Sequence, residues 1–158
     1  MTAEVALDLI DWQILRELHE DARLSVAELA RRVSLSRPAV ADRLRRLEDA
    51  GVITGYGIRV DAARLGFELQ AVVRIRTHDP SGNALDRMLS EIPEVVECRH
   101  VTGEDCYVLT VWARSMADLE RVCTHLATAG RTTTSLVFST RIHHRIPLLP
   151  ATTTPPGA

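Results

Sequence analysis

With 158 residues, 46% of them hydrophobic, the chain is long enough for one medium domain or two small ones with a packed core. A formal net charge of -2 excludes a protein that is basic throughout, so any contact with nucleic acid must come from a local patch. No apolar run approaches the ~18 residues of a membrane span, and the N-terminus lacks a basic signal-like start. The three cysteines follow no recognisable spacing pattern, which indicates reduced thiols. We therefore expect a cytoplasmic protein without a membrane partner.

A first helix is predicted by apolar residues at helical spacing: Leu7, Ile10, Ile14, Leu15 and Leu18. Asp8 is its expected N-cap. A second helix is predicted by Ser25, which is followed three residues later by Glu28 in the pattern of a capping box. Both helices are short.

A third helix is predicted after Ser36, a favourable N-cap, with Pro38 near its first turn. It should run to about Ala50 and stop at Gly51, since glycine is the usual residue just past a helix C-terminus. Only a tight turn separates it from the second helix. Three short helices with this spacing predict a helix-turn-helix arrangement.

Residues 52–60 (VITGYGIRV) contain glycines between short β-branched runs, which predicts a small hairpin and a winged-helix-like domain. Residues 61–66 look like a one-turn connector. The predicted elements then follow the order βαββαβ: strand 69–77, helix 81–92, strand 95–101, strand 106–113, helix 115–127 and strand 132–142. This order predicts a ferredoxin-like unit, in which an antiparallel sheet carries two helices on one face.

The fold class is therefore α+β, with an N-terminal helix-turn-helix domain followed by a ferredoxin-like domain. We expect domain limits of 5–60 and 68–146, with residues 61–67 as the linker. Residues 147–158 are rich in Pro and Thr and lack charge and periodicity, which predicts a disordered tail.

The chain contains no lysine, and its arginines concentrate near the third helix: six lie between Arg31 and Arg46, with Asp42 as the single acid. One interpretation is a solvated helix face with pairs such as Arg45 to Asp49. The other is an anionic partner, because arginine binds phosphates and guanine edges bidentately. The tight turn and the capped helix favour DNA, since a recognition helix meets DNA near its N-terminus.

The N-terminal third resembles the Lrp/AsnC family of bacterial and archaeal transcription regulators. The similar segments there are residues 7–15 (LDLIDWQIL), 22–36 (ARLSVAELARRVSLS) and 43–56 (RLRRLEDAGVITGY). Further segments resemble the family's effector domain: 101–111 (VTGEDCYVLTV), 116–122 (MADLERV) and 131–140 (RTTTSLVFST). The resemblance covers residues 5 to about 146 and implies a regulator that binds double-stranded DNA and responds to a small effector such as an amino acid.

The expected DNA-facing residues lie on the third helix and its N-cap: Ser36, Arg37, Ala39, Asp42, Arg43, Arg45 and Arg46. The sequence does not separate base contacts from phosphate contacts. If Arg43 and Arg46 contact DNA, replacing both should flatten the salt dependence of binding.

The resemblance also implies that the effector binds near the hairpin turn of the second domain, between neighbouring subunits. The matching positions are Thr102, Gly103, Glu104, Asp105, Cys106, Thr132, Thr134 and Ser135. Glycine permits a close approach of the backbone, amides hold a carboxylate and an acidic side chain holds an ammonium. The alternative is a plain turn and a polar sheet edge. Family members often carry aspartate at the position of Cys106, so the identity of the effector stays open.

Strand 106–113 is apolar on both faces, but the helices of a ferredoxin-like unit cover only one face. The uncovered face predicts a second copy of the same sheet, and a helix-turn-helix that reads two half-sites also needs a dimer. We expect a homodimer or a higher even oligomer.

Cysteine and histidine occur together at 98–100 and 123–125, but Cys123 and His125 would lie about 200° apart on a helix and cannot share one metal ion. We interpret these cysteines as small apolar fillers and expect no metal, no cofactor and no catalytic residue. One enzymatic alternative remains: siroheme decarboxylase subunits resemble the same two-domain family, and His100 and His143 would then lie near a tetrapyrrole.

Overall fold

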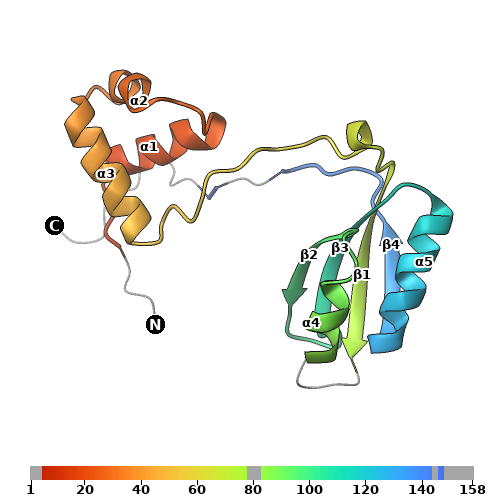
Figure 1. The fold of residues 1–158 in the computed structure, drawn as a ribbon. Coiled ribbons are helices and arrows are strands. Elements are labelled where there is room, and N and C mark those ends of the chain that lie inside the picture. Colours follow the sequence, from red (N-terminus) through yellow and green to blue (C-terminus); the bar gives the residue numbers. More distant parts are fainter. Residues whose placement is uncertain (1–4, 78–82, 144–145, 148–158) are drawn as a thin grey trace. The chain divides into compact units, whose positions relative to one another are not determined.

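The computed structural model describes residues 5–77, 83–143 and 146–147. The chain divides into two compact units: the first consists of the described residues up to Arg59 and from Ile142 onward, and the second runs from Val60 to Arg141. The first unit contains three helices, and the second contains a four-stranded sheet with two helices (Figure 1). Two predicted features lie outside the described residues: the C-terminal tail beyond Pro147 and the start of helix 81–92.

The first unit is built from α1 (Leu9–Glu20), α2 (Val26–Arg32) and α3 (Arg37–Asp49). All three predicted N-caps are confirmed, because the side chains of Asp8, Ser25 and Ser36 accept hydrogen bonds from backbone N–H groups of the first turn. The full capping box occurs at α1, where Asp11 accepts from the Asp8 amide, and not at α2. The Glu28 carboxylate is instead occupied by arginines of its own helix.

The helix-turn-helix turn and the end of α3 both have defined backbone geometry. Ser34, between α2 and α3, has a φ of 56°, in the left-handed region. Past the end of α3, Gly51 has a φ of 68°. Its N–H donates to Glu48 O at 2.9 Å, and the next N–H, of Val52, donates to Leu47 O at 2.9 Å. These two bonds form a Schellman motif, which confirms the predicted stop at Gly51.

One apolar cluster holds the three helices together. Its buried members are Ile14, Leu29, Ala30, Val33, Val40 and Leu47. Val52 and Ile53 pack against it from beyond α3. None of the helices in the described parts of the chain is long and apolar enough to cross a bilayer.

The predicted hairpin over residues 52–60 is wrong, because the structure assigns no strand there. Val52 and Ile53 turn back onto the helical core, and the Tyr56 hydroxyl donates to Glu48 Oε1 at 2.6 Å. The start of the segment is thus held against α3 and does not pair with a second strand. The one-turn connector is confirmed as a 3-10 helix, Ala63–Leu65.

The second unit has the predicted βαββαβ order: β1 (Leu69–Thr77), α4 (Asn83–Leu89), β2 (Val95–His100), β3 (Tyr107–Ala113), α5 (Met116–Leu126) and β4 (Gly130–Leu136). The sheet order is β2-β3-β1-β4, and all neighbouring strands are antiparallel. The ferredoxin-like prediction is therefore confirmed. Both helices pack on one face of the sheet (Figure 1).

The last strand differs from its predicted limits of 132–142. It begins earlier, at Gly130, and ends at Leu136. The register explains both limits, since β4 pairs with β1 from Gly130 opposite Thr77 to Leu136 opposite Ala71. One further backbone bond follows, from Val137 to Gln70 O, at the end where β1 begins.

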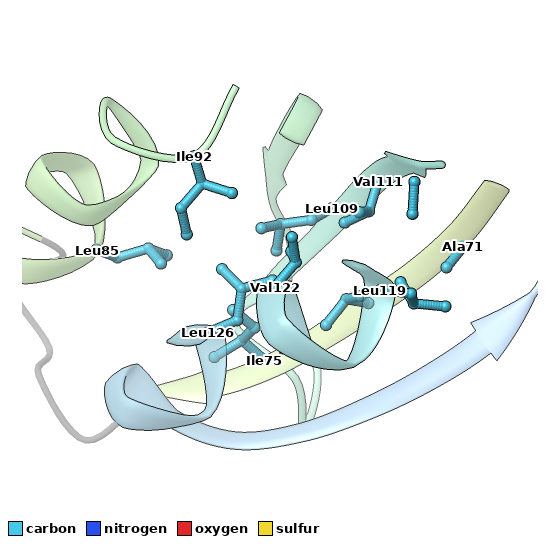
Figure 2. Packing of buried hydrophobic residues seen from close by; sticks show 11 residues of the cluster. Ala71, Ile75, Leu85, Ile92, Leu109, Val111, Leu119, Val122 and Leu126 are labelled. Carbon is cyan, nitrogen blue, oxygen red and sulfur yellow. The ribbon is translucent and has the colours of Figure 1, made fainter. Parts of the chain in front are cut away.

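Figure 2 shows the core between the sheet and the helices. Alternate residues of β1 and β3 point into it, and α4 and α5 contribute the facing side chains: Leu85, Leu119, Val122 and Leu126. Neither α4 nor α5 covers the opposite face of the sheet (Figure 1). That open face carries most of the second candidate site described below.

Candidate functional site

The outer surface of α3 is polar and exposed. Ser36, Arg37, Asp42 and Arg45 are exposed, while Ala39 is half-buried. Val40 and Leu47 lie on the opposite side, in the core, because they are spaced by seven residues and share one stripe of the helix. The predicted DNA-facing set therefore divides according to which side chains are free and which are held within the unit.

Arg43 and Arg46 are held by α1. Arg43 Nη1 donates to Asp8 Oδ2 and to Asp11 Oδ1, both at 2.7 Å, and Arg46 Nη2 donates to Asp11 Oδ2. The Asp11 side chain is fully buried, so its charge requires these partners. Hydrogen bonds to Asp8 and Asp11 raise the pKa of Arg43 further above its ordinary value. Both arginines thus fasten α3 to α1, a role that was not predicted.

Arg31 and Arg32, beside the turn, are also paired. Arg31 Nη2 donates to Glu28 Oε1 at 2.6 Å, and Arg32 Nη1 donates to Glu17 Oε2 at 2.7 Å. Hydrogen bonds from Arg31, and then from Arg32, lower the pKa of Glu28 to about 2. Ion pairs with Glu17 and Glu28 therefore neutralise part of the positive charge that the sequence concentrates beside the turn.

Arg37 and Arg45 remain available to an anionic partner. Within the described residues no ion pair involves Arg37, which lies in the first turn of α3. Arg45 makes a 3.3 Å pair with Asp42 of the same helix, and both side chains are about 70% exposed, at 69% and 73%. A pair of this kind is weak in water and breaks readily for a stronger anion. A phosphate oxygen is such an anion.

The predicted effector turn joins β2 to β3. Thr102, Gly103 and Glu104 are exposed, and Asp105 and Cys106 are half-buried. Gly103 has a φ of 120°, a conformation that side-chain-bearing residues rarely adopt. The Asp105 carboxylate lies 3.7 Å from Arg74 Nε, on the neighbouring strand β1.

Two of the predicted β4 residues do not join this turn. Thr132 and Thr134 pair in register with Ile75 and Val73, whose side chains are buried under the helices. The Thr134 hydroxyl accordingly lies 3.3 Å from Cys123 Sγ of α5. Alternation along the strand places Thr133 and Ser135 on the open face instead.

A cavity of about 300 Å³ lies on the open face next to the turn. Its lining residues are Arg74, Arg76, Glu104, Asp105, Arg131 and Thr133. The three arginines and Thr133 were not predicted from the sequence as effector-site residues. The signal was the spacing of Arg74 and Arg76, two residues apart on a strand whose alternate residues Val73 and Ile75 are apolar.

The cysteine and histidine residues of β2 and α5 lie apart from one another in the sheet and the helix. In the parts of the chain that the structure describes, no three metal-ligating side chains cluster. His100 stacks on Tyr107, with ring centroids 4.8 Å apart, and desolvation raises the pKa of Cys98. These residues contribute to packing at the edge of the sheet.

Two family models cover the chain: a winged helix-turn-helix DNA-binding domain matches residues 7–54, and the Lrp/AsnC ligand binding domain matches residues 70–147. The regulator LrpA of Mycobacterium tuberculosis is 40% identical over 138 residues, covering 85% of this chain and 92% of that protein. The structure of Bacillus subtilis LrpC matches with a TM-score of 0.84 at 31% identity, covering 89% of this chain and 100% of that one.

A second similar structure is the feast or famine regulatory protein of M. tuberculosis in complex with L-methionine. It has a TM-score of 0.82 and 38% identity, and the match covers 91% of this chain and 100% of that one. These relatives are named as transcriptional regulators, and none of the comparisons supports the siroheme decarboxylase alternative. The helix-turn-helix unit, the βαββαβ unit and these matches lead to one conclusion: the chain belongs to the Lrp/AsnC family of transcriptional regulators.

Proposed function

We propose that the protein is a cytoplasmic transcription regulator that binds double-stranded DNA through α3. The observation that carries the proposal is that, among the described residues, Arg37 and Arg45 make no ion pair with α1, whereas Arg43 and Arg46 of the same capped helix do. A helix held this firmly presents its outer face to a groove of DNA with little loss of conformational entropy. Arg43 and Arg46 support this geometry through their ion pairs with Asp8 and Asp11.

The second unit binds the effector, a small molecule of the amino-acid class. Support comes from the match to the Lrp/AsnC ligand binding domain and from a relative solved with L-methionine. The turn residues Glu104 and Asp105 border a cavity that contains both signs of charge. A zwitterion needs a cation for its carboxylate and an anion for its ammonium, and this cavity has both.

The functional unit is a homodimer or a higher even oligomer. The open face of the sheet exposes apolar side chains, among them Val96, which is 45% exposed, and the half-buried Val108 and Trp112. Trp112 contacts Phe67, whose ring lies under the Arg114 guanidinium at 4.5 Å. A second copy of this face would bury the apolar surface, and two copies of α3 would read two half-sites.

The DNA-binding proposal is tested by the salt dependence of binding. The full-length protein is used to select duplex DNA from random sequences, and Kd is then measured by fluorescence anisotropy at several salt concentrations. Arg37→Gln and Arg45→Gln should each lower the slope of log K against log salt by about 0.9 for each phosphate that the arginine neutralises in the wild type. Arg64→Gln is the matched control, since Arg64 is an exposed arginine of the connector.

Equal slopes for the wild type and for both α3 variants would place these arginines off the DNA. An equal fall with Arg64→Gln would show a general effect of net charge and would also contradict the proposal. The oligomer is tested separately by light scattering, where a monomer at micromolar concentration would contradict it.

A further inference from the structure

Three arginines gather on the open face of the second unit, within two rungs of the β1–β4 ladder. Arg76 lies directly opposite Arg131, and Arg74 lies opposite Thr133. All four residues line the same cavity. Like charges placed directly opposite each other on neighbouring strands destabilise a sheet. The fold thus accepts a local electrostatic cost at this point.

The acids of the cavity compensate for only part of this charge. Asp105 pairs with Arg74 at 3.7 Å. Among the described residues, no ion pair joins Arg76 or Arg131 to an acid, and Glu104 likewise has no paired cation. In a single copy of the chain, the cavity therefore offers two guanidinium groups and one carboxylate that have no ion-pair partner among the described residues.

We propose that this cavity selects an effector with two carboxylates and one ammonium group, the class of aspartate and glutamate. One free arginine binds the α-carboxylate, the other binds the side-chain carboxylate, and Glu104 binds the ammonium. The cavity of about 300 Å³ is at the small end of ligand sites and suits a single amino acid. This inference rests on the proposed effector function of the same site.

Other ligand classes fit the charges less well. An amino acid with a neutral side chain leaves Arg76 or Arg131 without a carboxylate partner. A polyanion such as a nucleoside triphosphate would meet Glu104 and Asp105, whose charges repel it. Two positive sites with one negative site match a ligand of net charge −1.

The test is a calorimetric titration of the full-length protein with five probes: L-glutamate, L-aspartate, L-glutamine, L-asparagine and L-methionine. We expect each acid to bind about tenfold or more tightly than its amide, because the amide cannot form one of the charged hydrogen-bonded pairs. Arg76→Gln and Arg131→Gln should each bring this ratio close to one. Arg99→Gln is the control, an exposed arginine on β2 that does not line the cavity.

Thermal unfolding supplies a second readout. Without ligand, Arg76→Gln and Arg131→Gln should raise Tm, because each removes the like-charge pair. Both variants should then lose the further rise in Tm that glutamate gives the wild type. A purely structural role for the arginines would instead lower Tm in the variants.

Several outcomes would overturn the proposal. One is equal binding of acid and amide by the wild type, and another is an acid preference that survives in both variants. A third is dissociation of the oligomer in the variants by light scattering, which would assign the arginines to acids of a second copy. If methionine or the amides bind and shift DNA affinity while the acids do neither, the acidic-ligand inference fails and the proposed function stands. If no amino acid binds, the effector half of the proposed function fails with it.

Discussion

The fastening of α3 to α1 can be tested by replacing Asp11 with asparagine. Asp11 accepts from Arg43, from Arg46 and from the Asp8 amide, and its side chain is fully buried. Asp11→Asn keeps the shape and one acceptor oxygen, but it removes the negative charge and places an amide NH₂ toward guanidinium donors. The two arginines then face each other without a shared counter-charge.

Removing one partner of a buried ion pair costs about 3–5 kcal/mol when the remaining charge is also buried. Here the remaining charges are on Arg43 and Arg46, whose side chains are 26% and 50% exposed, so water compensates for part of the loss. We expect the free energy of unfolding of the first unit to fall by about 2 kcal/mol. For a unit of this size, that corresponds to a fall in Tm of about 8–16 °C.

The two tryptophans allow each unit to be followed separately. Trp12 lies on α1 and Trp112 on β3, so a Trp112→Phe background reports the helix-turn-helix unit alone by fluorescence. The matched control is Asp42→Asn, the same chemical change at an exposed pair on α3, which should leave Tm within about 1 °C. If both substitutions shifted Tm by the same small amount, the account of Asp11 would be wrong.

Three further predictions concern packing and pH. Gly130→Ala should lower Tm in a thermal melt, because a Cβ at this position would lie 2.2 Å from the Arg76 carbonyl oxygen; an unchanged Tm would contradict the β1–β4 register. Leu109→Ala should reduce the unfolding free energy in urea by about 3–5 kcal/mol, since Leu109 is fully buried under the helices; a reduction below about 1 kcal/mol would mean that the core is loose. Desolvation raises the pKa of Asp8, but hydrogen bonds from a backbone amide and from Arg43 outweigh it and hold that pKa below its ordinary value. Asp8 therefore stabilises the fold above about pH 4 and loses this effect as the pH falls further, so Tm should drop less steeply below pH 4 in Asp8→Asn than in the wild type.

The elements were predictable where local chemistry decides them. The N-caps Asp8, Ser25 and Ser36 and the stop at Gly51 act within one helical turn, so a short window of sequence contains the whole signal. The strand β1 was predicted with its observed bounds, because apolar residues recur at every second position from Leu69 to Ile75.

The roles of Arg43 and Arg46 were not predictable in this way. Their partner Asp11 lies more than thirty residues earlier in the chain, and only the packing of α3 on α1 brings the three together. A count of arginines along α3 cannot distinguish a side chain that faces solvent from one that is paired with another helix. The expected hairpin over residues 52–60 failed for a related reason, since the contacts of Val52 and Ile53 with the helical core took precedence over β-propensity.

The register between β1 and β4 decides which residues of β4 lie at the effector site. The family resemblance implies Thr132 and Thr134 as effector residues, but pairing with β1 places them on the helix-covered face of the sheet and places Thr133 at the cavity. A shift of one residue along a strand changes the face of every side chain. The cavity lined by Arg74, Arg76 and Arg131 depends on the same register, because two strands and a turn that are distant in sequence contribute its residues.

The central claim is that DNA binding by the first unit is coupled to amino-acid binding by the second. The most direct measurement is the Kd of the full-length protein for its selected duplex, by fluorescence anisotropy, with and without saturating L-glutamate, L-aspartate or L-methionine. The account predicts that at least one of them changes this Kd by about 5–150-fold, and that saturating DNA changes the affinity for that amino acid by the same factor. Amino-acid binding that leaves the DNA Kd unchanged, or a chain that binds no duplex DNA, would contradict it.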